Sequence, residues 1–168
     1  MHRIFVFFVT AALFIVDAQQ HLATAAIPGV ERVVVYKSRQ IMQLLAGNEV
    51  VRSYQVALGR SPLGAKERAG DNRTPEGAYV IDWHKKESKF YKSLHISYPN
   101  SRDLASAKNR GLSPGGNIMI HGLPKGFEDL VDFHYTRNWT KGCIAVNNAE
   151  MDEIWQLVAD GTPIVIMP

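Results

Sequence analysis

The chain has 168 residues, of which 46% are hydrophobic and 21% are charged, and this ordinary globular composition excludes a disordered or low-complexity chain. Its 19 basic and 16 acidic residues give a net charge of +3, without the basic block that would indicate nucleic-acid binding. The single cysteine, Cys143, excludes an internal disulfide and a multi-cysteine zinc site. The length suits one catalytic domain.

The N-terminal segment predicts a secretory signal peptide over residues 1–25. A short basic start precedes the apolar run Ile4–Val16, which is too short to span a membrane. A small-residue cleavage motif ends at Ala25, so the expected mature domain covers residues 26–168, and an uncleaved N-terminal anchor is the alternative. Export to the periplasm or cell envelope would make Cys143 either a buried, inert thiol or a reactive one.

Alternating and β-branched segments predict a β-rich chain with one or two short helices. One helix is predicted over residues 101–110 with Ser101 as its N-cap, and a second begins after Asn147, where Glu150 completes a capping box. Apolar residues recur at helical spacing over residues 151–158, which indicates one buried face. The predicted fold class is therefore α+β, predominantly β, around a mixed or antiparallel sheet. Strands are predicted over residues 33–36, 40–45, 50–58, 77–83, 93–97, 117–120, 143–146 and 164–166.

The candidate chemistry is nucleophilic catalysis by a cysteine and a histidine. The four histidines of the expected mature chain form no H-E-x-x-H motif or other metal-ligand spacing, so no metal is expected. The chain also lacks a G-x-S-x-G elbow and a phosphate-binding glycine loop. Cys143 follows Gly142 in the segment W-T-K-G-C-I-A-V, and His121 ends a short apolar strand. A nearby histidine can take the proton of a thiol, and backbone amides beside the thiol can stabilise an oxyanion.

Each of these residues also has a structural interpretation. A cysteine between glycine and isoleucine at a strand start is often a small core residue, and a histidine after an apolar strand is often structural. His95 alternates with apolar neighbours in its strand, so it either lines a cleft or fills part of the core. Lys141 would add positive charge beside the Cys143 thiolate and lower the pKa of that thiol.

The two segments together resemble the signature of the L,D-transpeptidase (YkuD) catalytic domain family. I-M-I-H-G at 118–122 and T-K-G-C at 140–143 are similar to the family's H-G and S/T-x-G-C motifs. The resemblance covers residues 31–167 and implies a mixed β-sheet sandwich or barrel with the cysteine and the histidine on neighbouring strands. Its further segments are V-V-Y-K-S at 34–38, A-L-G at 57–59, T-P-E-G at 74–77 and L-H-I-S-Y-P-N at 94–100.

The resemblance implies a role for each candidate site residue. Cys143 would be the nucleophile and His121 the base that activates it, while the amides of Gly142 and Cys143 would form the oxyanion hole. The expected substrate contacts are Thr140, at the S/T position of the motif, Trp139 and Arg137, in the loop before the cysteine, and also His95 and Gly122.

The resemblance also implies a substrate, because the family acts on peptidoglycan stem peptides in the bacterial envelope. Cys143 would attack the diaminopimelate carbonyl of a tetrapeptide stem, and a second stem or a wall-anchored lipoprotein would accept the acyl group. A carbapenem would acylate the same thiol, and neither a cofactor nor nucleic acid is expected.

One position departs from the family pattern. Many members carry arginine two residues after the cysteine, where this chain has Ala145. We expect the carboxylate contact of that arginine to be lost or to move to Arg137 or another basic residue of the loop. The alternative, which strand alternation favours, is that Ala145 packs inward against the helix face over residues 151–155. Some members with G-C-I-A are associated with cleaving envelope cross-links and not with forming them. A hydrolase acting on the same type of bond is therefore one alternative. A non-catalytic wall-binding module is the other.

Overall fold

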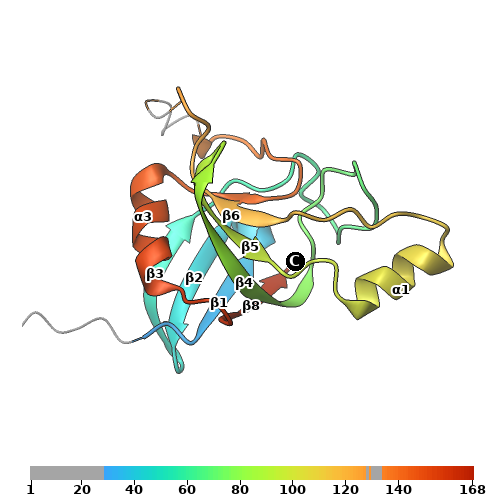
Figure 1. The fold of residues 1–168 in the computed structure, drawn as a ribbon, viewed down its shortest axis with the longest axis horizontal. Coiled ribbons are helices and arrows are strands. Elements are labelled where there is room, and N and C mark those ends of the chain that lie inside the picture. Colours follow the sequence, from blue (N-terminus) through green and yellow to red (C-terminus); the bar gives the residue numbers. More distant parts are fainter. Residues whose placement is uncertain (1–28, 128, 130–133) are drawn as a thin grey trace, which may run out of the picture.

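The structure is a computed structural model that describes residues 29–127, 129 and 134–168 (Figure 1). The predicted signal peptide over residues 1–25 lies outside the described residues, so it stays a prediction. Within the described part of the chain, no helix is long and apolar enough to cross a membrane.

The described residues form one mixed eight-stranded sheet. Its strands are β1 (Arg32–Tyr36), β2 (Ile41–Ala46), β3 (Glu49–Gln55), β4 (Gly77–Ser88), β5 (Tyr91–Ile96), β6 (Met119–His121), β7 (Ile144–Ala145) and β8 (Pro163–Met167). The spatial order is β3-β2-β1-β8-β4-β5-β6-β7. The pairs β1/β8 and β6/β7 are parallel, whereas the other neighbours are antiparallel. The sheet is therefore mixed, as predicted.

The sheet closes on itself through the segment that follows β3. Ala57 and Ala145 exchange backbone hydrogen bonds of 2.9 and 2.8 Å, which join this segment to β7. A second bridge joins Gly59 to Thr140. Closure gives the barrel-like form that the sequence resemblance implies, and it places the residues around Cys143 between two hydrogen-bonded neighbours.

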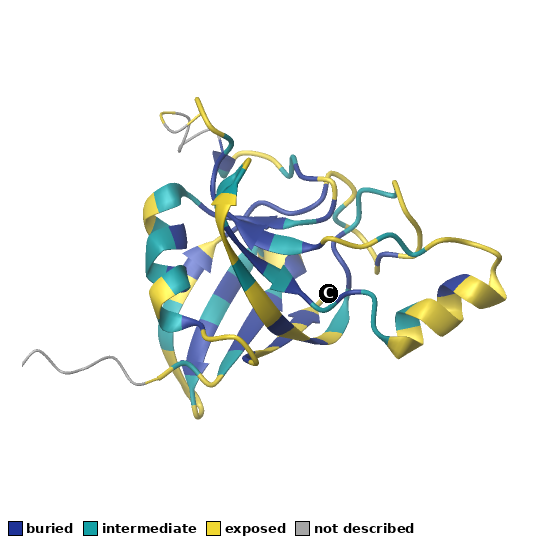
Figure 2. Ribbon diagram, viewed as in Figure 1, coloured by how far each residue is buried: buried dark blue, intermediate teal, exposed yellow. Residues whose placement is uncertain are grey.

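The hydrophobic core lies inside this curved sheet because apolar residues alternate along most strands. Leu94 and Ile96 of β5, Ile120 of β6 and Ile144 of β7 are all fully buried. The central strand β1 contains an uninterrupted run of three valines at 33–35, as expected for a strand that is covered on both faces. Figure 2 shows the buried residues concentrated along the strands, while most of α1 is exposed.

Of the two α-helices in the described residues, α3 (Asn148–Leu157) packs on the sheet, whereas α1 (Ser101–Asn109) projects away from it (Figure 1). The first helix is capped by Asn100 rather than by the predicted Ser101, since the Asn100 side chain accepts hydrogen bonds from the amides of Arg102 and Asp103. Only Ala107 of this helix is buried, so α1 contributes little to the core.

The second helix begins as the sequence predicts and joins the core. Asn147 and Glu150 form the expected capping box, and Met151 and Ile154 are fully buried against the sheet. Its first residue also holds the end of β6, because Asn148 Oδ1 accepts the backbone N–H of Leu123 at 2.8 Å. The start of α3 therefore helps to position the histidine that ends β6.

We expect Asn147→Ala to lower the free energy of unfolding by about 1 kcal/mol, since it removes the side-chain acceptor of the capping box. Asn100→Ala removes the equivalent acceptor from α1 and is the matched control. Chemical denaturation measures both changes. If Asn147→Ala lowers the free energy of unfolding by less than Asn100→Ala does, the assignment of α3 to the core is contradicted.

Candidate active site

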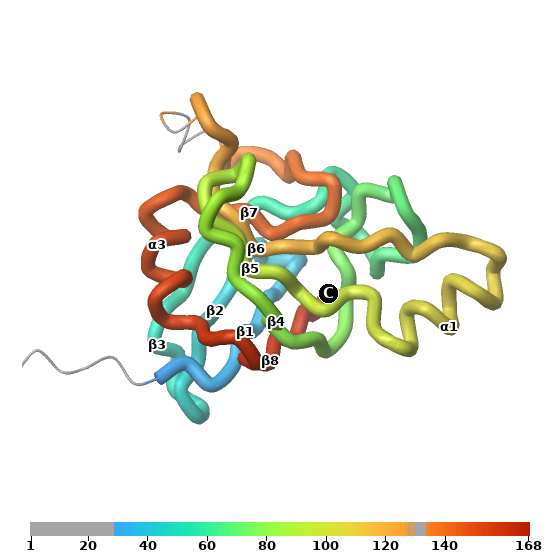
Figure 3. Tube along the Cα trace, in the orientation of Figure 1, coloured from blue at the N-terminus to red at the C-terminus, as the bar shows by residue number. Residues whose placement is uncertain are grey.

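The pairing of β6 with β7 brings His121 and Cys143 to the same face of the sheet. Ile120 lies opposite Ile144 and both belong to the core cluster, so His121 and its partner Ala145 lie on the other face of the sheet, where both are also buried. Cys143 precedes Ile144 and shares that face. Its sulfur lies beside the start of β6, where it donates a hydrogen bond to Asn117 O at 3.6 Å. Figure 3 shows β5, β6 and β7 side by side.

The hydroxyl of Thr140 shapes the loop that carries the cysteine. It donates a hydrogen bond to Cys143 O at 2.7 Å and accepts the Gly142 N–H at 3.1 Å. Thr140 is only 4% exposed, so its side chain holds the loop instead of facing a cleft. The Gly142 amide, one member of the expected oxyanion pair, is therefore already bonded within the loop.

Any residue other than glycine at position 142 would have a strained backbone. Its φ is +130°, and a Cβ atom there would lie 2.7 Å from Arg73 O and 3.2 Å from Ile118 Cδ1. The long segment between β3 and β4 therefore packs directly on the cysteine loop.

A backbone carbonyl sets the tautomer of His121. Its Nδ1 lies 2.7 Å from Gly122 O, and since a carbonyl can only accept, Nδ1 carries the proton. Nε2 then holds the lone pair needed to take a proton from a thiol. Gly122 is itself buried, and a Cβ there would lie 2.5 Å from Asn148 Oδ1. Its role in the structure is thus to orient His121 through its carbonyl.

Burial keeps both members of the pair uncharged at neutral pH. Burial lowers the pKa of His121 to about 4, against the opposing effect of the Gly122 carbonyl, and the nearby His134 lowers it further. Burial also raises the pKa of the Cys143 thiol, although the Met119 amide and the charge of Lys66 act in the opposite direction. The structure therefore holds a neutral thiol and a neutral imidazole on the same face of β6 and β7.

This result differs from the lowered thiol pKa that the sequence predicts. The expectation relied on His121, on the loop amides and on Lys141, which is exposed, and it took no account of desolvation. The lysine whose charge acts on Cys143 is Lys66, a residue of the long β3–β4 segment. Lys66 is 8% exposed and is held by Asp71 at 2.7 Å, so its position is set by an ion pair.

Two aromatic side chains pack near the His121 ring. The ring of Phe90 lies 4.5 Å and that of Trp139 5.7 Å from the His121 ring. The Trp139 indole N–H donates to His134 Nδ1 at 3.0 Å, which fixes the indole in place. Trp139, a predicted substrate contact, is therefore at the site, and Phe90 is a neighbour that the sequence did not indicate.

Ser93 is a second neighbour that sequence reasoning missed. It lies directly opposite His121 in the β5/β6 pair and is fully buried. Among the described residues, its hydroxyl oxygen has no hydrogen-bond partner. In the sequence Ser93 is one of several polar residues of β5, and its position becomes informative only once the register is known.

The remaining predicted site residues, His95, Arg137 and Ala145, differ in their placement and burial. His95 faces outward on β5, opposite Met119, so it lies beside the site and does not fill the core. Arg137 is exposed in the segment that leads to Trp139. Ala145 is completely buried and hydrogen-bonded to Ala57, so the expectation that position 145 is a substrate-contact position is wrong.

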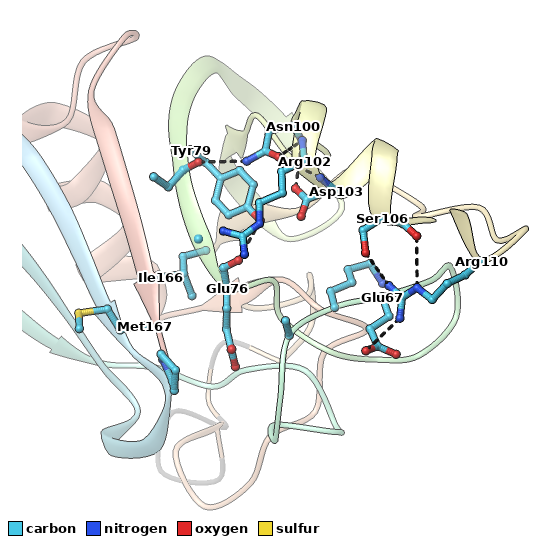
Figure 4. A pocket seen from close by; sticks show the side chains of 15 residues that line it. Glu67, Glu76, Tyr79, Asn100, Arg102, Asp103, Ser106, Arg110, Ile166 and Met167 are labelled. Atoms are coloured by element: carbon cyan, nitrogen blue, oxygen red, sulfur yellow. Dashed lines mark hydrogen bonds and ion pairs between the residues drawn. The ribbon is translucent and has the colours of Figure 1, made fainter. Parts of the chain in front are cut away.

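A polar pocket of about 640 Å³ lies elsewhere, between α1 and the ends of β4 and β8 (Figure 4). Its charged side chains are partly paired, since Arg110 contacts Glu67 at 3.1 Å and Glu76 binds the buried Lys37 at 2.7 Å. Neither Cys143 nor His121 lines it.

The comparisons with known proteins agree with this geometry. The family model described as the L,D-transpeptidase catalytic domain matches residues 30–166, and the chain belongs to this family. YafK of Escherichia coli strain K12, which carries an L,D-transpeptidase name, is 33% identical over 112 residues. The match covers 66% of this chain and 38% of YafK, so the chain spans well under half the length of that relative.

Solved structures share the fold. The helical cell shape determining protein Pgp2 of Campylobacter jejuni, as its K307A mutant, has a TM-score of 0.60 and 26% identity, covering 83% of this chain and 47% of that one. Bd1075 of Bdellovibrio bacteriovorus has a TM-score of 0.58 and 21% identity, covering 83% and 48%. The expected fold and family are thereby confirmed.

We expect Gly142→Ala to lower the free energy of unfolding by about 2 kcal/mol or more and to slow alkylation of Cys143, because the added methyl meets Arg73 O. Gly161→Ala is the matched control, with a φ of +90° and open space around the added atom. Denaturant titration and thiol alkylation measure both effects. Equal destabilisation by the two substitutions would show that backbone strain alone, and not the contact with Arg73, is responsible.

Proposed function

We propose that the chain is a cysteine-dependent L,D-transpeptidase that acts on tetrapeptide stems of peptidoglycan in the cell envelope. The observation that carries the proposal is His121, which is held by Gly122 with Nε2 as its free lone pair, on the same sheet face as Cys143. Family membership supports the reaction class. Export by the predicted signal peptide would bring the domain to this substrate.

The neutral pair supports general-base activation at the moment of attack. As the Cys143 sulfur bonds to the diaminopimelate carbonyl carbon, its proton passes to His121 Nε2, and the Cys143 amide stabilises the oxyanion. The intermediate then collapses with cleavage of the C–N bond, and His121 returns the proton to the departing D-Ala amine. A thioester to Cys143 results.

The second half of the reaction decides between a transferase and a hydrolase. An amine from a second stem or a wall-linked lipoprotein attacks the thioester, loses a proton to His121 and forms a new amide. If water attacks instead, the products are a free tripeptide stem and the regenerated thiol. The first half-reaction is the same for both.

The test is incubation of the purified protein with a disaccharide-tetrapeptide, followed by mass spectrometry of protein and products. We expect a mass gain equal to the substrate minus D-Ala on wild-type protein and none on Cys143→Ala, which should fold normally. Product masses then separate cross-linked dimers from tripeptides. Turnover by Cys143→Ala would contradict the nucleophile assignment, and absence of any adduct or product would favour a wall-binding module.

A carbapenem provides a second probe of the same thiol. Acylation by the drug needs the nucleophile and its base but not a peptide acceptor. It therefore reports on Cys143 and His121 even where the natural acceptor has not been identified.

The pH dependence of acylation should follow the depressed pKa of His121. The imidazole acts as a base only when it is unprotonated, so the rate should fall as the pH drops through about 4 and not through the ordinary histidine value near 6.5. Rapid-quench measurement of the rate of acylation by a carbapenem between pH 3 and 8 gives the acidic side of the pH–rate profile. Thermal melts at each pH are the control for folding. A midpoint near 6.5 would contradict the buried, neutral imidazole.

A further inference from the structure

A row of outward side chains runs across the sheet from Cys143. Met119 lies beside the cysteine at the start of β6, and His95 of β5 lies directly opposite Met119. His95 in turn lies opposite Trp83 of β4. Because neighbouring strands are about 4.8 Å apart, His95 is about 9–10 Å from the backbone of Cys143.

A β-bulge in β4 supplies two partners to His95. Ile81 pairs with Ile96 but Trp83 pairs with His95, so Asp82 is the additional residue in this stretch. Asp82 Oδ1 lies 2.6 Å from His95 Nδ1, and the Trp83 ring stacks on the imidazole with centroids 4.8 Å apart. Without the bulge, the alternation of β4 would send Trp83 to the core face with Ile81.

These three side chains have the chemistry of a cation site. A carboxylate only accepts hydrogen bonds, so His95 Nδ1 donates to Asp82, and in the neutral imidazole Nε2 is then an acceptor. Asp82 adds a negative charge, and the face of Trp83 attracts cations. The group is open to solvent, since the side chain of Asp82 is 39% exposed and Trp83 is 38% exposed.

We propose that Asp82, Trp83 and His95 form a subsite that binds the side-chain ammonium of the diamino acid whose carbonyl Cys143 attacks. The proposal rests on the proposed function and adds the feature that selects the donor stem. Six bonds separate that carbonyl carbon from the distal amine of diaminopimelate, a reach of roughly 7 Å when extended. With a hydrogen bond at its end, this reach matches the two strand spacings between Cys143 and His95.

The distal carboxylate of the same side chain has a partner on this face. Lys85 lies opposite Ser93, one outward position further along β4 from Trp83, and its side chain is exposed. The subsite therefore offers opposite charges to the two groups that the distal end of the diamino acid carries.

The test compares two tetrapeptide stems that differ only at the distal amine, which is free in one and acetylated in the other. For wild-type protein we expect kcat/KM for thioester formation to be about tenfold higher with the free amine. Asp82→Asn, which removes the charge at nearly constant shape, should lower the value for the free amine to that for the acetylated peptide. The matched control is Glu87→Gln, an exposed carboxylate on the same strand, which should leave the tenfold preference intact.

Carbapenem acylation is measured on the same variants, because it needs Cys143 and His121 but no diamino acid. It should be equal in wild-type, Asp82→Asn and Glu87→Gln proteins. Equal rates with free and acetylated peptides in wild-type protein would overturn the subsite while leaving the proposed function in place.

If neither peptide forms a thioester, the proposed function fails separately, and calorimetric titration of both peptides into Cys143→Ala protein still tests the subsite. Tighter binding of the free-amine peptide, lost on introducing Asp82→Asn, would support the subsite. Equal binding of the two peptides would overturn it.

Discussion

The parallel pairing of β6 with β7 is the constraint on which the site depends. Each strand is very short, yet the register between Ile120 and Ile144 anchors both in the core and leaves His121 and Cys143 on the other face. The pair would lose its geometry if either strand shifted by one residue, because every side chain would then change face. The buried isoleucines thus set the alignment of the reactive groups, although they take no part in the chemistry.

The same burial that fixes the geometry determines the protonation state. Desolvation disfavours a charged imidazole and a charged thiolate, and the described surroundings of the pair oppose it only with the Gly122 carbonyl, the Met119 amide and the distant charge of Lys66. A resting ion pair would require stronger compensation than these groups supply. The protein therefore holds Cys143 as a neutral thiol, and this state protects a lone cysteine from oxidants that react with thiolates.

The sequence was sufficient to single out Cys143 and His121 as candidates because each residue sits in a compact local motif, and the structure brings both to one face of the sheet. His121 and Cys143 follow or precede short apolar strands, and the capping box at Asn147 marks the helix that comes next. The N-cap of α1 was misplaced by one residue because Asn100 and Ser101 both suit that position. What could not be predicted depends on register and on long connections. The contact between Asp82 and His95 requires a bulge, Lys66 reaches the site through a long irregular segment, and the direction of the thiol pKa follows from tertiary burial.

The bridge between Ala57 and Ala145 has a consequence for how a peptide can approach. An open strand edge beside a nucleophile lets a peptide extend the sheet, with its main chain bonded in register to the enzyme. Here β7 is bonded to β6 on one side and to Ala57 on the other, so it has no free edge to offer. A substrate must lie across the face of the sheet and be recognised through its side chains. Such recognition does not require a uniform L-configured backbone, so it would suit the proposed substrate, a stem peptide with D-residues and a side-chain linkage.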